Sequence, residues 1–333
     1  MLVLVTGATG FLGRWIVRAL AEAGHEARVL ARDRARAERA LGGGADIQVG
    51  DPMRPDDVLA ALGGCDRLVH AAAVYSYERR DAARMVEENP RLARTVLAAA
   101  READVERVVD VSSAVVFRLG ASRVDESSPI AGPGDRGWDD PYLQSKALAE
   151  RVGQDLDEAG LRRVTIHPTS VLGPEDSGPG TSGGVVVSLL RGGSSADGRL
   201  GWVDVRDVAA AAVAALDAPT GRRYLVTPGV RTLADVADRL DALTGRHPRR
   251  LFVPPRIVRL LARLNDLAAG RLAPLPPAPA LEYVLDCPPV IDGALAEREL
   301  GIRYRDLDET LADAIRWWAA NGVIPVELAG RLA

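Results

Sequence analysis

A glycine-rich segment that directly follows a short apolar run constrains the fold of this chain more than any other feature. Residues 6–13 read TGATGFLG, with the spacing Gly-x-x-Gly-x-x-Gly, and they open a helical pattern. Gly7 permits a tight turn, Gly10 lets the backbone approach a ligand, and Gly13 allows the helix to pack closely on the strand. Because free N–H groups at a helix N-terminus attract an anion, the segment predicts a site for the pyrophosphate of a dinucleotide.

Short apolar runs alternate with longer helical patterns through the first half of the chain. This alternation is typical of βαβ units, whose right-handed crossovers place parallel strands in one sheet. The expected strands are 2–6, 27–31, 46–49, 67–70, 107–111 and 163–167, and the expected helices are 12–23, 34–41, 55–62, 81–103 and 141–159. We therefore expect an α/β fold built on a Rossmann-type, doubly wound parallel sheet.

Composition narrows the classes of protein and of partner. A hydrophobic fraction of 47% in 333 residues can form a full core, and a net charge of −4 offers no basic surface for nucleic acid. Cys65 and Cys287 lack the spacing of a disulfide framework or a metal site, which favours a reducing, cytoplasmic location. The apolar start lacks the basic region of a signal peptide, and no run reaches the roughly 20 apolar residues of a membrane span. A small-molecule substrate is expected.

The composition changes after Pro168 to glycine, proline and serine, which indicates that the chain leaves the sheet for substrate-contacting loops. Later helices are expected at 185–190 and 204–216, and a strand at 223–226 that returns to the sheet. From Arg231 the pattern is mostly helical, interrupted by a proline-rich connector at 273–280. The predicted division is a core of 1–170, joined by 202–228, and a smaller, mostly helical substrate lobe of 171–201 and 229–333.

A second amphipathic pattern spans residues 256–267. Arg256, Arg259 and Arg263 stand at helical spacing beside leucines. This arrangement fits either a helix that lies on a membrane surface or an ordinary lobe helix with a solvated basic face. The second interpretation is favoured because surface helices of globular proteins commonly show this pattern.

The end of the second expected strand bears on the choice of cofactor. An acidic residue there would hold the ribose 2′-OH of NAD, but this chain has Ala31 followed by Arg32. A guanidinium suits the 2′-phosphate of NADP, and Arg36 follows one turn later. A shift of two residues in the strand end would instead make Asp33 the acidic ribose ligand. The sequence favours NADP(H) and leaves NAD(H) open; Asp51, after the third strand, is expected near the adenine.

Tyr142 and Lys146 lie one turn apart on a helix that Asp140 is expected to cap. The unperturbed pKa of tyrosine is about 10, but a neighbouring ammonium and an oxidised nicotinamide both favour the phenolate. Tyr-x-x-x-Lys alone is common on exposed helices. Ser113, preferred to Ser112, supports a catalytic role for this pair. It follows the fifth strand, and strand ends carry the ligand site of an open sheet. Tyr142 is expected to move a proton while Ser113 donates to the substrate oxygen.

Taken together, these segments resemble the extended short-chain dehydrogenase/reductase family, and within it the dihydroflavonol-reductase-like and hydroxysteroid-dehydrogenase-like members. The matching pieces run in family order: TGATGFLG (6–13), HAAA (70–73), VSSA (111–114), YLQSK (142–146), HPTSVLGP (167–174) and WVDVRDVA (202–209). The resemblance implies a Ser/Tyr/Lys catalytic set, a dinucleotide-binding core, a C-terminal substrate lobe and a homodimer through the tyrosine helix. Asn89 matches an asparagine of the family, although a surface cap is an equally good interpretation.

The candidate site follows from these motifs. Its catalytic residues are Ser113, Tyr142 and Lys146, and no metal ligand is expected. Its cofactor-binding residues are Thr6, Gly7, Thr9, Gly10, Phe11, Leu12, Gly13, Arg32, Arg36, Asp51, Pro52, Ala71, Ala72, Ala73, Val111, Tyr142, Lys146, His167, Pro168, Ser170 and Val171. His167 and the pair Phe117-Arg118 depart from the family, which has Arg or Asn and Tyr-Gly there, so the substrate does not carry over.

Three functions compete. The first is a ketoreductase or alcohol dehydrogenase that acts on a small, fairly apolar molecule. The second is a nucleotide-sugar epimerase or dehydratase, against which the missing acid at Ala31 argues. The third is a non-catalytic dinucleotide sensor, against which Ser113, Tyr142 and Lys146 together argue. The sequence favours the first.

Overall fold

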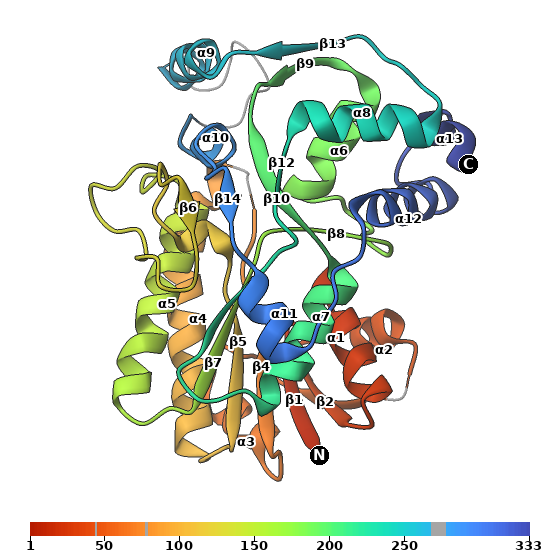
Figure 1. The fold of residues 1–333 in the computed structure, drawn as a ribbon. Helices are drawn as coiled ribbons and strands as arrows, with labels where there is room; N and C mark the ends of the chain where they lie inside the picture. The colour runs from red at the N-terminus through yellow and green to blue at the C-terminus, as the bar shows by residue number, and fades with distance from the viewer. Residues whose placement is uncertain (44, 77–78, 268–277) are drawn as a thin grey trace.

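The computed structural model describes residues 1–43, 45–76, 79–267 and 278–333, and its largest element is a seven-stranded parallel sheet (Figure 1). The strand order β3-β2-β1-β4-β5-β7-β11 reverses direction between β1 and β4, so this is the switch point at which doubly wound sheets bind ligands. The expected sheet is confirmed. Its strands are β1 (Leu2–Thr6), β2 (Glu26–Ala31), β3 (Asp46–Val49), β4 (Arg67–His70), β5 (Arg107–Val111), β7 (Arg163–Pro168) and β11 (Arg223–Val226).

Helices cover both faces of the sheet, with one group at the left of Figure 1 and the other at the lower right. Because side chains alternate along a strand, β1 sends Val3 and Val5 into one core and Leu4 into the other. All three side chains are fully buried, which explains why the strand reads as an unbroken apolar run. The flanking helices are α3 (Pro55–Leu62), α4 (Ala82–Glu102) and α5 (Pro141–Glu158) on one face, and α1 (Phe11–Glu22), α2 (Arg34–Leu41), α7 (Val205–Ala214) and α11 (Ala294–Leu300) on the other.

A smaller lobe lies beyond the carboxyl ends of the strands (Figure 1). Its core packs the buried side chains of Trp202, Leu240 and Trp318 against one another. A three-stranded sheet runs through it, formed by β8 (Ser170–Leu172), β10 (Arg199–Asp204) and β12 (Val230–Thr232). The lobe helices are α6 (Thr181–Arg191), α8 (Leu233–Thr244), α9 (Pro255–Leu267), α10 (Ala278–Leu285), α12 (Leu307–Ala320) and α13 (Val326–Ala329).

Several expectations for the second half were wrong in detail. The helix expected at 185–190 is the longer α6, and the helix expected at 204–216 is α7 followed by a short 3-10 turn, with Asp204 capping it. Two small parallel pairs were not predicted at all: β9 (Gly193–Ala196) with β13 (Arg250–Val253), and β6 (Arg123–Val124) with β14 (Val290–Ile291). Residues 273–277 of the expected connector lie outside the described residues, and 278–280 begin α10.

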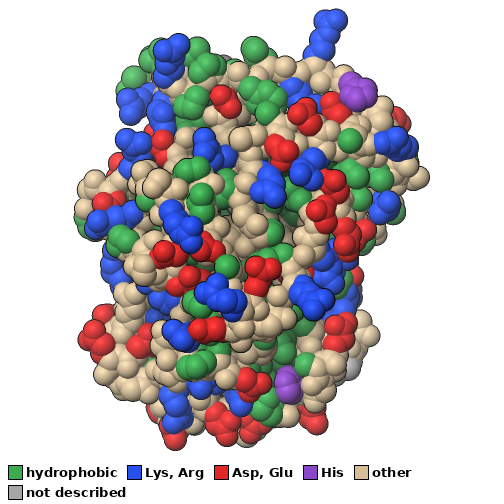
Figure 2. All heavy atoms as spheres, viewed as in Figure 1, with side chains coloured by type: hydrophobic (Ala, Val, Ile, Leu, Met, Phe, Trp, Pro, Cys, Tyr) green, Lys and Arg blue, Asp and Glu red, His purple; other side chains and the backbone are tan. Residues whose placement is uncertain are grey.

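The exposed face of α9 differs from the solvated basic face that was expected. Ala262 and Asn265 are buried, while Ile257, Leu260, Leu261, Leu264 and Leu267 are between 42% and 86% exposed. Figure 2 shows hydrophobic and arginine side chains together over this corner. The helix is amphipathic as expected, but aliphatic side chains share its outer face with arginines. Within the described residues, no helix combines the length and the apolar character that crossing a membrane requires.

Hydrogen bonds and an ion pair join α1 of the core to the segment that leads into the lobe. Trp15 and Arg14 of α1 donate hydrogen bonds to the backbone carbonyls of Pro174 and Glu175, which follow β8. Arg18 adds an ion pair with the Glu175 carboxylate at 3.1 Å. One residue further on, the Asp176 carbonyl accepts a hydrogen bond from the indole of Trp318 in α12.

Candidate active site

The glycine segment forms a tight cradle at the switch point. Gly7 has a φ of +77°, and a Cβ on it would lie 2.6 Å from the Ala72 nitrogen. A Cβ on Gly13 would lie 2.1 Å from the Gly7 carbonyl oxygen, so only glycine lets α1 pack this closely on the turn. Gly10 is the exposed N-cap of α1 and supplies no side-chain cap. The N-terminal N–H groups of α1 therefore remain available to an anion, which fits the pyrophosphate of a dinucleotide.

His70 connects the ends of β1 and β4. Its Nδ1 lies 2.7 Å from the hydroxyl oxygen of Thr6, and both side chains are buried. Burial lowers the pKa of His70 to about 4, although Asp110 acts in the opposite direction. The imidazole is therefore neutral at pH 7 and serves as an uncharged clamp. Beyond it, Ala71 and Ala72 pass beside the glycine turn, with the Ala71 N–H donating to the Thr6 carbonyl at 3.2 Å.

The second strand ends at Ala31, as the sequence predicted. Asp33 caps α2 by accepting a hydrogen bond from the Arg36 N–H at 3.0 Å. The side chains of Arg32 and Arg36 are exposed. Asp51 accepts a hydrogen bond from the Met53 N–H at 3.0 Å and so shapes the turn after β3. The end of β2 is thus followed by exposed arginines, while Asp33, the alternative ribose ligand, caps α2.

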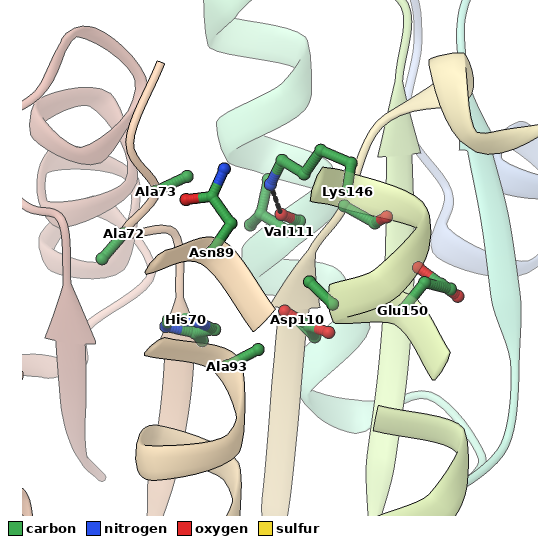
Figure 3. Close-up of a pocket in the computed structure, with 11 residues that line it drawn as sticks. His70, Ala72, Ala73, Asn89, Ala93, Asp110, Val111, Lys146 and Glu150 are labelled. Carbon is green, nitrogen blue, oxygen red and sulfur yellow. Dashed lines mark hydrogen bonds between the residues drawn. The ribbon is translucent and has the colours of Figure 1, made fainter. Parts of the chain in front are cut away.

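Ser113, Tyr142 and Lys146 meet at the carboxyl end of β5. Asp140 accepts a hydrogen bond from the Tyr142 N–H at 3.0 Å and begins α5, as expected. From α5, the Tyr142 phenol is hydrogen-bonded to the Ser113 side chain. One turn later, the Lys146 ammonium donates to the carbonyl of Val111 at 3.1 Å (Figure 3). The structure thus brings the three expected catalytic side chains together.

Burial governs the ionisation of the two groups on α5. It raises the pKa of Tyr142 above its ordinary value, and nearby Tyr75 adds to this, while the hydrogen bond with Ser113 opposes it. The sequence gave no sign of this burial. Burial also lowers the pKa of Lys146, which Asp110 and Glu150 oppose. A protonated phenol at this place can donate a proton to a substrate oxygen.

Aromatic side chains that the sequence analysis missed surround Tyr142. The Tyr75 ring meets the Tyr142 ring edge to face, with centroids 4.8 Å apart. Tyr283 of α10 lies close enough to Tyr142 that Tyr142 helps to raise the pKa of Tyr283. Trp138 packs, like Tyr142 and Tyr283, against the apolar cluster that includes Leu143. Loops and the lobe supply these rings, so only the folded chain brings them to the site; no local motif marks them.

Asn89 of α4 is buried rather than a surface cap, so that alternative was wrong. Its Oδ1 accepts a hydrogen bond from the Val74 N–H at 2.7 Å. Its Nδ2 donates to the Val74 carbonyl at 2.9 Å and to the Ser145 hydroxyl at 3.0 Å. Asn89 therefore ties the segment after β4 to the helix that carries Tyr142 and Lys146.

The site residues among 167–171 differ in how deeply they are buried. The His167 side chain is fully buried, 3.2 Å from a Glu150 oxygen, with its ring centroid 5.1 Å from that of Phe117. That side chain is thus engaged in the interior, where Glu150 and Phe117 are its neighbours. Pro168 is buried as well, while Ser170 and Val171 are half-buried on β8.

The sequence holds one further signal at Lys146. It is the only lysine among the 42 lysine and arginine residues of the chain. Arginine keeps its charge in every protein environment, whereas the ammonium of lysine can be tuned and can lose a proton. A single lysine at the convergence point of the site indicates that an amine is needed there.

Comparisons with known proteins agree with this geometry. Residues 3–227 match the model of the NAD dependent epimerase/dehydratase family. The chain is 31% identical to sterol demethylase protein B of Methylococcus capsulatus, over 97% of this chain and 100% of that protein. It is 29% identical to the 4-hydroxy-2-methyl-3-oxo-4-farnesyl-3,4-dihydroquinoline-1-oxide ketoreductase of Stigmatella aurantiaca, over 98% of this chain and 99% of that protein.

Among solved structures, the crystal structure of gox2253 superposes with a TM-score of 0.82 at 27% identity, and the match covers 96% of this chain and 98% of that one. The family match, the sheet order and the glycine cradle describe the same kind of protein. The chain belongs to the NAD-dependent epimerase/dehydratase family, the extended short-chain dehydrogenases/reductases, and is an NAD(P)-dependent enzyme that acts on CH–OH or C=O groups.

Proposed function

We propose that the protein is an NADP(H)-dependent ketoreductase or alcohol dehydrogenase whose substrate is a small, apolar molecule. The observation that carries the proposal is the convergence of Ser113, Tyr142 and Lys146 at the end of β5, where the Lys146 ammonium is 3.1 Å from the Val111 carbonyl oxygen. Their residue types match the three tasks of carbonyl reduction: donation to an oxyanion, delivery of a proton, and stabilisation of the phenolate left behind.

In the direction of reduction, the substrate carbonyl oxygen accepts hydrogen bonds from Ser113 and Tyr142. The nicotinamide of a dinucleotide held in the cradle would supply the hydride for the carbonyl carbon. Tyr142 passes its proton to the oxygen as negative charge develops there, and the Lys146 ammonium stabilises the resulting phenolate. Oxidation of an alcohol reverses these roles, with Tyr142 accepting the proton.

We propose that the glycine cradle and α1 hold the pyrophosphate, and that Arg32 and Arg36 hold the 2′-phosphate of NADP. Ala31 supports this choice because it occupies the end of β2 without an acidic side chain. The cap formed by Asp33 also supports it, since one carboxylate oxygen is already bonded to the Arg36 N–H. The remaining cofactor-binding candidates lie at the strand ends or in the first turn of α1 and stay part of this proposal, His167 through its backbone alone because its side chain is fully buried.

The surroundings of Tyr142 support an apolar substrate. Tyr75, Tyr283 and Trp138 offer ring surfaces, whereas a nucleotide sugar brings a diphosphate that needs cations. Arg118 and Arg136, in the loop before α5, are already paired with Asp135 at 2.9 Å and with Asp286 at 3.0 Å. The names of the two relatives refer to a sterol and to a farnesyl-bearing ketone, which points in the same direction.

The domain division, the oligomeric state and the location in the cell are also proposals. We propose a core of residues 1–170 with 202–228, and a substrate lobe of 171–201 with 229–333. The return of β11 to the large sheet and the separate lobe core support this division. We also propose a homodimer through α5, which light scattering tests, and a cytoplasmic location, which fractionation of the source cells tests.

The test begins with binding and ends with turnover. Titration of cofactor fluorescence should show tighter binding of NADPH than of NADH, and a panel of apolar ketones and aldehydes should oxidise NADPH. An epimerase or dehydratase would convert its substrate without net oxidation of cofactor. Tighter binding of NADH would contradict the role of Arg32, and full activity of a Tyr142→Phe variant would refute the catalytic proposal.

A further inference from the structure

Two buried carboxylates lie near the catalytic lysine. Asp110 is on β5, and Glu150 is on α5 one turn after Lys146 (Figure 3). All three residues line one small cavity of about 20 Å³, which is the space that a single water molecule needs. Both carboxylates raise the pKa of Lys146 against the effect of burial. The charge of the ammonium thus depends on two anions in the protein interior.

Strand β7 supplies a partner for each carboxylate. Arg163 donates to Asp110 at 2.9 Å, and its side chain is 2% exposed. His167 lies 3.2 Å from Glu150, and the two side chains are 0% and 1% exposed. Arg163 and His167 are four residues apart on one strand, so they face the same side of the sheet, toward α5.

The proton in the His167 contact lies on the imidazole. An ionised carboxylate only accepts hydrogen bonds, so Nε2 of His167 donates to Glu150. Burial opposes the ionisation of Glu150, but His167, Arg163 and the Ser112 hydroxyl together hold its pKa below the ordinary value. Without such partners a buried carboxyl takes up a proton and becomes neutral.

The other charged side chains around Glu150 have contacts of their own. From α5, Asp157 is bonded to Arg163 at 2.8 Å. From β11, Arg223 lies over the Phe117 ring, 5.0 Å from its centroid, and Phe117 packs on His167. Arg163 divides its hydrogen bonds between Asp110 and Asp157, so His167 and the Ser112 hydroxyl are the partners bonded to Glu150 itself.

We propose that His167 is a positioning residue, which keeps Glu150 anionic near Lys146 and thereby helps to hold the lysine as an ammonium. This inference rests on the proposed role of Lys146 in the reaction. It assigns to His167 a task that needs neither cofactor nor substrate contact, in keeping with its full burial. In this position the residue acts on the reaction through two others, Glu150 and Lys146.

The single lysine allows a direct measurement. Protein labelled with ¹³C-lysine gives one set of lysine side-chain signals, which belongs to Lys146 and reports its ionisation as the pH is varied. A His167→Leu variant removes the donor, and Glu150→Gln removes the anion. Each is expected to lower the titration midpoint of Lys146 by about half a pH unit or more. His167→Gln is the matched control, because its amide restores an N–H donor, and it should return the midpoint to that of the native protein.

A midpoint that His167→Leu leaves unchanged would overturn the proposal, as would a midpoint that His167→Gln fails to restore. If the leucine variant does not fold, His167→Asn replaces it, since its shorter amide does not reach Glu150. The pH profile of alcohol oxidation should move in the same direction as the Lys146 midpoint, with its alkaline limb displaced to lower pH in the donor-less variant, because the ammonium is then lost at lower pH. Full activity of Tyr142→Phe would refute the proposed function whatever the NMR result, so the two failures are distinguishable.

Discussion

Replacing Gly13 with alanine tests the cradle from which the cofactor assignment starts. The new methyl carbon would lie 2.1 Å from the Gly7 carbonyl oxygen and 2.7 Å from the Ala8 Cα, both backbone atoms. Ordinary C···O contacts are about 3.3 Å, so α1 must move away from the turn by about 1 Å. Overpacking of this kind costs roughly 1–3 kcal/mol, while alanine returns at most about 1 kcal/mol through helix propensity.

A net loss of about 1–2 kcal/mol corresponds to a fall in Tm of roughly 1.5–3 °C in a chain of this size. The displaced α1 N-terminus should also weaken NADPH binding by at least about tenfold, or about 1.4 kcal/mol. Thermal unfolding with and without NADPH measures both effects. Gly184→Ala in α6 is the control, because its methyl group would meet nothing closer than 3.9 Å and should stabilise the helix. A Gly13→Ala protein with native Tm and native NADPH affinity would refute the close packing of α1 on the turn.

Three other outcomes are expected. Tyr142→Phe should lower kcat by about 10²–10⁴-fold and leave the NADPH dissociation constant unchanged by fluorescence titration; an equal loss in both would mean a damaged fold. Replacing Arg32 and Arg36 with alanine should weaken NADPH binding and spare NADH, and equal weakening of both would contradict their role. The folded state lowers the pKa of His70 from 6.5 to about 4, so the unfolded state binds more protons between these values and stability falls as pH falls. From pH 7 to 5 the loss is about 2 kcal/mol in urea unfolding, and a His70→Asn variant that loses as much would refute the assignment.

The sheet, and the placement of Ser113, Tyr142 and Lys146 at one strand end, could be predicted from the sequence because their signals are local. The strands β1, β3, β4, β5 and β11 begin and end at the expected residues, since each is an apolar run between turn signals. Tyr142 and Lys146 are fixed by helical spacing, and Ser113 by the end of a strand. Burial on both faces of a parallel sheet leaves little freedom in such segments.

The features that were missed depend on contacts between distant segments. β9 pairs with β13 across more than fifty residues; β9 has no apolar pattern, and the apolar run of β13 is only three residues long. The rings of Tyr75 and Tyr283 reach Tyr142 from different parts of the chain. His167 stands at the end of a strand, where both a site role and an interior role are open until Glu150 is seen opposite it.

The bonds between α1 and residues 174–176 have a consequence for motion. They join the helix that is proposed to hold the cofactor phosphates to the segment that leads into the lobe, and the Trp318 hydrogen bond continues this line of contacts, here called the seam, into α12. A lobe attached in this way does not lift off as a free body, because that would break several partly buried hydrogen bonds at once. We expect it to swing about this seam as a hinge, so that the gap widens first near Tyr142 and Tyr75. Substrate would then enter and leave there while the dinucleotide stays held by its phosphates.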